Sequence, residues 1–166
     1  RNRRKTSSIL LLTPMKAQLA VEIEMPQGTS ASLAAGTITI KGPKGEVSRK
    51  LGDPSIKTKI DGNKISMNAE GSKRQKRSMN TFEAHIKNML TGVQSPYQYR
   101  LKICSGHFPM NVAISGDQLH VKNFLGEKSP RIVKLKKGVI VKIEGDKILV
   151  ESSDKDLAGQ MASDIE

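Results

Sequence analysis

The hexapeptide Ile60–Ile65 (IDGNKI) returns 83 residues later as Ile143–Ile148 (IEGDKI). In both copies a short apolar segment ends, a turn containing glycine follows, and a second apolar segment begins. Turns of this kind accept the positive φ angles that tight β-hairpins require. Each hexapeptide therefore predicts a hairpin, and the pair predicts an internal repeat.

A second pair of segments aligns in the same order. Ile38–Lys41 (ITIK) parallels Leu119–Lys122 (LHVK) at an offset of 81 residues, and a Gly-Glu pair follows each segment. A length difference of two residues between the intervening blocks explains why the two offsets differ. Chance similarity of strand–turn–strand patterns is the alternative, and two anchors in the same order weigh against it.

Alternating apolar residues predict short strands around these anchors. In the first round they are expected at 19–25, 37–41, 46–51, 56–60 and 64–69. In the second round they are expected at 97–103, 111–115, 119–122, 131–135, 139–144 and 147–151. Because adjacent strands are joined by short turns, most of the pairing is expected to be antiparallel.

Between the two rounds the apolar period changes to that of a helix. One stripe is formed by Met79, Phe82, Ile86, Met89, Leu90 and Val93. Ser72, Ser78 or Asn80 can cap the start of this helix. Gly92 can cap its end, and Pro96 prevents its continuation. The stripe is expected to pack on a sheet.

A second helix is expected after Asp154, with Leu157, Met161 and Ile165 on one face. The sequence thus predicts an α+β fold of two tandem duplicated domains, each a small, mainly antiparallel sheet packed against one helix. We expect the first domain at residues 15–94 and the second at 95–166. Residues 1–14 are expected to be a basic N-terminal extension, either disordered or not part of the native protein.

Charge indicates the class of partner. The chain of 166 residues has a formal net charge of +12, and only 3% of its residues are aromatic. Residues 1–80 carry a net charge of +10, residues 121–142 carry +6, and residues 143–166 carry −5. Separate basic and acidic blocks favour an oriented surface for a polyanion, with nucleic acid as the first expectation. Charge that serves solubility alone is the alternative.

Several functional classes find no support in the sequence. The longest aliphatic run, Ile9–Leu12, is too short for a membrane span, so an intracellular protein is expected. The single Cys104 excludes an internal disulfide and a multi-cysteine zinc site. Cys104 and His107 are the only candidates for a nucleophile and its base, and nothing orients them as a pair. We therefore expect no enzyme activity, cofactor, metal or small-molecule substrate.

Cations concentrate in loops, where Lys and Arg can pair with phosphates and Asn or Ser can bind phosphate or 2′-hydroxyl groups. The main candidates are Lys122, Asn123, Lys128, Ser129, Arg131, Lys134, Lys136 and Lys137. Further candidates are Lys41, Lys44 and Arg49 in the first repeat, and Lys73 and Arg74 at a helix start. Cations at a helix start oppose its dipole, a cost that an external polyanion would offset. A solvated charged loop is the alternative.

Four ordered motifs carry a family resemblance. They are Ile40–Arg49 (IKGPKGEVSR), His85–Met89 (HIKNM), His107–Val112 (HFPMNV) and Lys122–Lys128 (KNFLGEK). Together they resemble the universal L6 family of large-subunit ribosomal proteins, in its archaeal and eukaryotic-type form, over about residues 15–166. The leading fourteen residues have no counterpart in that pattern. The basic stretch that follows the last helix in the family is not found before Glu166.

The resemblance implies two α+β domains related by duplication, and a structural component of the ribosome without catalytic activity. It implies binding to 23S-type rRNA, mainly through the second domain, near the stalk base and the sarcin–ricin region. Neighbouring large-subunit proteins and translation factors would be close, and the location would be cytoplasmic. His107, within a shared motif, joins the rRNA-binding candidates. An RNA-processing enzyme and a free basic adaptor outside the ribosome are the competing hypotheses.

Overall fold

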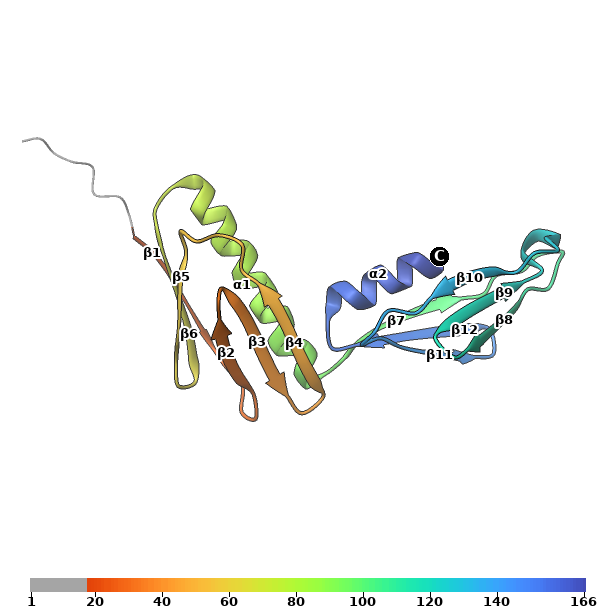
Figure 1. Cartoon of the computed structure of the whole chain (residues 1–166), viewed down its shortest axis with the longest axis horizontal. Helices are drawn as coiled ribbons and strands as arrows, with labels where there is room; N and C mark the ends of the chain where they lie inside the picture. Colours follow the sequence, from red (N-terminus) through yellow and green to blue (C-terminus); the bar gives the residue numbers. More distant parts are fainter. Residues whose placement is uncertain (1–17) are drawn as a thin grey trace, which may run out of the picture.

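The computed structural model describes residues 18–166, which form two successive units of six strands and one α-helix each (Figure 1). The expected basic extension at residues 1–14 lies outside the described residues. We call the unit from β1 to α1 the first repeat and the unit from β7 to α2 the second repeat. They lie end to end, so that the described part of the molecule is elongated (Figure 1).

The strands of both repeats lie where the alternation of apolar residues predicted them. The first repeat consists of β1 (Gln18–Glu24), β2 (Ser30–Ala34), β3 (Thr37–Gly42), β4 (Gly45–Lys50), β5 (Lys57–Asp61), β6 (Lys64–Glu70) and α1 (Lys73–Gln94). The second consists of β7 (Tyr97–Lys102), β8 (Asn111–Ser115), β9 (Gln118–Lys122), a 3₁₀ turn η1 (Phe124–Gly126), β10 (Arg131–Lys134), β11 (Ile140–Glu144), β12 (Lys147–Ser152) and α2 (Lys155–Ile165). Every expected strand is present, and β2 is an additional one.

The two repeats share one topology. The first contains the three-stranded antiparallel sheets β1-β6-β5 and β2-β3-β4, and the second contains β7-β12-β11 and β8-β9-β10. Replacing each strand of the first repeat by the strand six places later converts one arrangement into the other. The predicted duplication and α+β class are confirmed, with the refinement that each repeat divides its strands between two sheets.

The two hexapeptides form equivalent hairpins. In the first, Asp61 pairs with Lys64, and Gly62 enters the turn with a φ of +57°. In the second, Glu144 pairs with Lys147, and Gly145 takes a φ of +58°. Both glycines therefore occupy the left-handed region that the turn demands. This local geometry explains why the repeat is visible in the sequence.

The core of the first repeat lies between α1 and the sheets. Met79, Ile86 and Val93 of α1 are buried, as are the sheet residues Ile38 and Met67. The helix begins with a capping box at Ser72: its Oγ accepts from the Gln75 backbone N–H, and its own N–H donates to Gln75 Oε1, both at 3.2 Å. Of the three predicted caps, Ser72 is the one used.

The second repeat has a smaller core, centred on Ile148, Val150 and Met161. The predicted face of α2 is only partly correct, because Leu157 is 37% exposed whereas Ala158 and Ala162 are buried. Met161 of the predicted stripe is fully buried and Ile165 packs against the core, so the prediction fails only at Leu157. The buried positions Ala158, Met161 and Ala162 follow the spacing i, i+3, i+4. Short alanine side chains let the helix approach β7 and β12 closely.

Gly92 lies inside α1, and its predicted role as the helix cap is wrong, since Ser95 is the C-cap. A Cβ at position 92 would lie 2.0 Å from the carbonyl oxygen of Ser153, in the β12–α2 connection. The glycine therefore permits direct backbone contact between the two repeats. Nearby, the Lys44 N–H donates to the Val93 carbonyl at 3.0 Å, and Ser153 Oγ donates to the Lys44 carbonyl at 3.0 Å.

Candidate nucleic-acid interface

Two loops form the end of the second repeat that lies farthest from the first (Figure 1). We call residues 104–110 and 122–131 together the distal tip. The loops are joined by a hydrogen bond of 2.9 Å from Asn123 Nδ2 to the Pro109 carbonyl. A Cβ added to Gly126 would lie 3.8 Å from the Phe108 ring. The Phe108 and His107 rings meet edge to face, with their centroids 5.0 Å apart. The tip is thus a connected structure.

Arg131 holds the longer of these loops together. Its Nε donates to Glu127 Oε2 at 2.9 Å, and its Nη2 donates to Glu127 Oε1 at 2.7 Å. The guanidinium also lies 4.1 Å from the centroid of the Phe124 ring. The hydrogen bonds from Arg131 lower the pKa of Glu127, so the pair stays charged. The Arg131 charge, predicted to contact phosphate, is largely compensated inside the loop.

Other predicted residues of the tip remain open to solvent. Lys122, Lys128 and Ser129 are exposed, and so is His107. Within residues 18–166, neither lysine has an ion-pair partner. These residues can therefore offer full positive charge and a hydroxyl group to a ligand.

The remaining second-repeat candidates lie along and beyond β10, which leads away from the tip. Lys136 Nζ lies 2.6 Å from Asp164 Oδ2 near the end of α2, and this hydrogen bond lowers the pKa of Asp164. Lys134 and Lys137 are exposed. The structure thus ties Lys136 to the second helix and leaves its two neighbours available.

The first-repeat candidates belong to a hairpin and not to an open loop, with Lys41 in β3 and Arg49 in β4. Lys41 pairs with Glu46 at 3.2 Å. Arg49 hydrogen-bonds Asp156 of α2 and contacts Nδ1 of His85, and its side chain is only 24% exposed. The structure therefore gives Arg49 a structural role between the repeats. Its predicted contact with rRNA stays a prediction.

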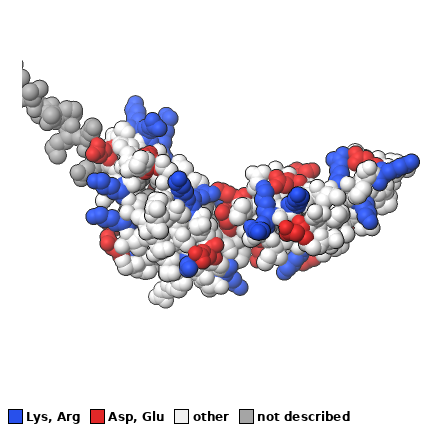
Figure 2. Space-filling view, viewed as in Figure 1, with Lys and Arg blue, Asp and Glu red and all other residues white. Residues whose placement is uncertain are grey.

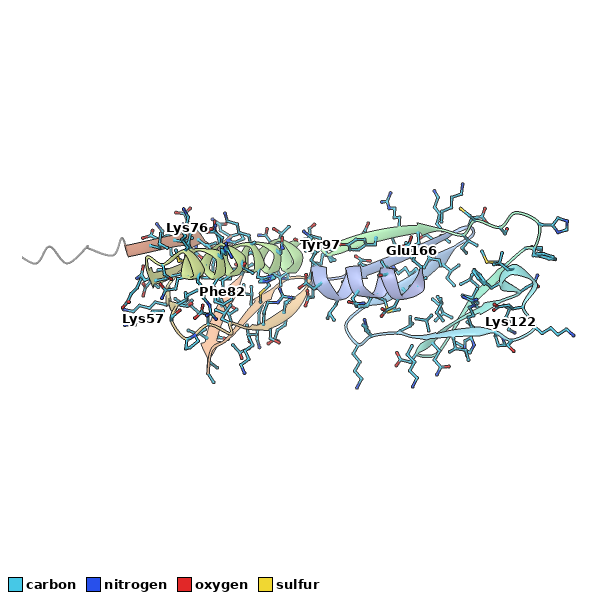
Figure 3. All side chains as sticks on the ribbon, turned by 90° about the horizontal axis from the view of Figure 1, so that it is seen from above. Lys57, Lys76, Phe82, Tyr97, Lys122 and Glu166 are labelled. Carbon is cyan, nitrogen blue, oxygen red and sulfur yellow. The ribbon has the colours of Figure 1, made fainter. Side chains whose placement is uncertain are left out.

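Lys73 and Arg74 are exposed at the start of α1, with Lys76 and Arg77 beside them. The first turn of α1 has no acidic residue. Figure 2 shows Lys and Arg side chains at this end and at the distal tip, and further ones between them, with acidic side chains interspersed. In Figure 3, Lys76 and Lys122 lie toward opposite ends of the molecule. The predicted cations thus fall into separate groups.

Sequence reasoning missed the apolar part of the tip. Phe108 is 48% exposed, and Leu125 is 75% exposed. Leu125 and Asn123 have φ values of +49° and +61°, in the left-handed region that residues other than glycine rarely enter. Apolar residues inside the HFP and NFLG motifs were the available signal, although their exposure depends on a loop shape that no spacing rule predicts.

The described residues contain no cluster of three or more side chains suited to hold a metal ion. Neither α-helix in residues 18–166 combines the length and the apolar character needed to cross a membrane. These findings concern the described part of the chain alone.

Comparison with known proteins gives consistent matches. A family profile described as ribosomal protein L6 matches residues 25–95 and 108–166. The large ribosomal subunit protein uL6 of Nanoarchaeum equitans is 48% identical over 152 residues, which cover 87% of this chain and 79% of the relative. The uL6 proteins of Methanosarcina mazei and Sulfurisphaera tokodaii are 39% and 40% identical, over 92% of this chain and 87% and 83% of their own lengths. The two blocks matched by the profile fall one on each repeat.

Proposed function

The chain belongs to the ribosomal protein L6 family, and from this membership we propose that it is a structural component of the large ribosomal subunit that binds 23S-type rRNA near the stalk base and the sarcin–ricin region. The resemblance found in the sequence, including its archaeal type, is thereby confirmed. A ribosomal protein of this family is a structural protein of the cytoplasmic ribosome and not an enzyme.

The distal tip is the main rRNA contact in this proposal. Exposed Lys122 and Lys128 carry charge without an internal partner among residues 18–166, and Ser129 adds a hydroxyl group beside them. Phosphate contacts from such residues supply most of the affinity of RNA binding. Arg131 contributes indirectly, because its hydrogen bonds to Glu127 hold the loop that carries the lysines. This single observation, an internally braced loop with unpaired lysines, carries the proposal.

The start of α1 is the second proposed contact. Its exposed cations, Lys73 and Arg74, lie at one end of a helix of 22 residues, and Gly92 near the other end lies against Ser153 of the second repeat. A helix of that length spans about 33 Å. The distal tip lies beyond that junction, at the far end of the second repeat (Figure 1). Two basic groups held at opposite ends of a braced scaffold suit an RNA that is already folded, since recognition then depends on shape. We further propose domains at residues 15–94 and 95–166, with the second as the main rRNA-binding domain.

The salt dependence of binding tests this proposal. For six to eight phosphate contacts, the slope of log affinity against log salt should be about −4 to −7. Lys128→Ala should weaken binding to a large-subunit rRNA fragment and reduce the magnitude of that slope by about 1. Lys142→Ala, an exposed lysine on β11 outside the tip, is the control and should change neither quantity. If Lys128→Ala and Lys122→Ala both bind like the parent, the tip is not the contact.

The location near the stalk base can be tested separately through Cys104. This residue is the only cysteine of the chain and is exposed in the distal tip. A hydroxyl-radical source tethered to its Sγ in the assembled subunit should cleave rRNA in the stalk base and the sarcin–ricin region. A Cys104→Ser variant treated with the same reagent supplies the background. Cleavage confined to other rRNA regions would overturn the proposed location.

A further inference from the structure

The distal tip exposes apolar side chains inside a cationic surface. Leu125 is 75% exposed and Phe108 is 48% exposed. The chain has only three phenylalanines and no tryptophan, and two of those phenylalanines, Phe108 and Phe124, belong to the tip. Single exposed apolar residues are ordinary on protein surfaces, whereas two of them in a pair of loops that are bonded to each other call for an explanation.

The backbone keeps Leu125 exposed at a cost. Leu125 has φ and ψ of 49° and 29°, and Asn123 has 61° and 33°. Both lie in the left-handed region, which β-carbon crowding disfavours for a leucine. The conformation persists because the loop is held on both sides, by the bond from Asn123 to Pro109 and by the pairing of Arg131 with Glu127. Strain of this kind concentrates where a ligand is bound.

The surroundings of the apolar surface indicate the chemistry of its ligand. The exposed Lys122 and Lys128 flank Leu125 in the chain, and Ser129 follows them. A nucleotide combines a flat, apolar base with a charged phosphate, and therefore complements both parts of this surface. Unpaired bases of folded RNA are commonly bound by stacking on aromatic side chains. A phosphate alone would leave Phe108 and Leu125 without a role.

We propose that the distal tip binds one unpaired nucleobase of the rRNA, which stacks on the Phe108 ring and packs against Leu125 while Lys122 and Lys128 contact the adjoining phosphates. The Phe108 ring packs edge-to-face on the His107 ring and lies beside Gly126, where an added Cβ would be 3.8 Å from it. This inference rests on the proposed function, because it requires that the tip face rRNA. It adds base recognition to a surface that was predicted to contact phosphate and 2′-hydroxyl groups.

Two substitutions separate the apolar contact from the charged one. Phe108→Leu keeps an apolar side chain but removes the aromatic face. Leu125→Asn removes the apolar side chain and introduces a residue that tolerates the left-handed region, so folding should be retained. Each should weaken binding of the full chain to a large-subunit rRNA fragment by about tenfold or more at every salt concentration. The salt slope should stay unchanged, because no phosphate contact is lost. Ile140→Ser, exposed outside the tip, is the control and should bind like the parent.

The RNA partner provides the decisive cross-check. Fragments with a single abasic nucleotide at each unpaired position in turn should include one that binds the parent about tenfold more weakly. That same fragment should cause little further loss with Phe108→Leu, because the stacking contact is already missing. Thermal unfolding of each variant shows whether it is folded before binding is measured.

The outcomes distinguish this inference from the proposed function. If Phe108→Leu and Leu125→Asn bind like the parent while Lys128→Ala reduces the salt slope, the tip faces rRNA and the base contact is wrong. If all three bind like the parent, the proposed tip contact fails as well. If the two apolar variants keep rRNA affinity but lose a neighbouring protein in the assembled subunit, the surface is a protein contact and the inference is overturned.

Discussion

Arg49 in β4 donates a hydrogen bond to the Asp156 carboxylate in α2 and so joins the two repeats across 107 positions of sequence. The same guanidinium contacts Nδ1 of His85 in α1. One side chain therefore connects a strand and a helix of the first repeat with the helix of the second. This polar contact and the close approach of Gly92 to the Ser153 backbone both join the two repeats.

A double-mutant cycle should detect this connection. Arg49→Gln and Asp156→Asn should each lower the free energy of unfolding, and their combination should cost less than the sum. Because Asp156 is 55% exposed, the coupling should be only about 0.5–1 kcal/mol. Urea unfolding of the four proteins measures it. Strictly additive effects would show that the pair contributes nothing to stability.

The contribution of Asp156 should depend on pH. The hydrogen bond from Arg49 lowers the pKa of Asp156 in the folded protein below its value in the unfolded chain, which is about 3.9. The stabilisation is therefore complete above about pH 5 and is lost as the pH falls below the unfolded-state value and through the lower, folded-state value. The difference in unfolding free energy between the parent and Asp156→Asn should shrink over that acidic range. A difference that stays constant down to pH 2 would contradict this assignment.

Gly92→Ala should destabilise the protein although it lies within a helix. Alanine normally stabilises a helix interior over glycine by about 1 kcal/mol. Here the new Cβ would meet the Ser153 carbonyl oxygen at 2.0 Å, so the repeats would have to shift apart. We expect a net loss of about 1–3 kcal/mol by urea unfolding. Gly159→Ala in α2 is the matched control. Its new Cβ would meet only the far end of the Tyr99 side chain, at 3.3 Å, so the substitution should be neutral or stabilise the protein by up to about 1 kcal/mol.

Asn123 can be tested by two substitutions that differ in backbone freedom. Asn123→Ala removes the hydrogen bond to Pro109 and also opposes the φ of +61°. Asn123→Gly removes the same hydrogen bond but accepts that φ. The alanine variant should therefore be less stable than the glycine variant by about 1 kcal/mol. Equal stabilities would mean that the left-handed backbone carries no cost here.

Ser72→Ala should lower the free energy of unfolding by about 1 kcal/mol, because it removes the cap of α1. Without the Ser72 hydroxyl, the Gln75 backbone N–H loses the oxygen to which it donates its hydrogen bond. Asn80→Ala is the control, because Asn80 is exposed within the helix and was an alternative cap in the sequence. That control should be neutral or slightly stabilising.

Most of the fold could be predicted because its signals are local. The two hairpins and α1 follow from turn glycines and from apolar residues at strand or helix spacing. The strand β2 was missed because Ser30–Ala34 (SASLA) has a single large apolar residue, and that residue, Leu33, is 40% exposed. β2 is held by its backbone hydrogen bonds with β3. Backbone pairing does not require apolar side chains, so a pattern of hydrophobic residues does not reveal this strand.

The candidate site was predictable as a set of residue types and not as a set of contacts. Which cations remain available depends on their partners, and those partners are distant in the sequence: Arg49 meets Asp156, and Lys136 meets Asp164. The pairing of Arg131 with Glu127 spans only four positions, but the loop that brings them together depends on left-handed residues that the sequence did not reveal. Gly92 was misassigned for the same reason, since its close neighbour belongs to the other repeat.

The unequal cores have a consequence for the order of folding. Because a chain is synthesised from its N-terminus, β1 to α1 can complete their large apolar interior before α2 exists. The C-terminal end of α1, with Gly92 and Val93, is then already folded when the second repeat is synthesised, and the second repeat can pack against it. The core of the second repeat is smaller and is centred on Ile148, Val150 and Met161. We therefore expect the first repeat to fold before the second repeat during synthesis.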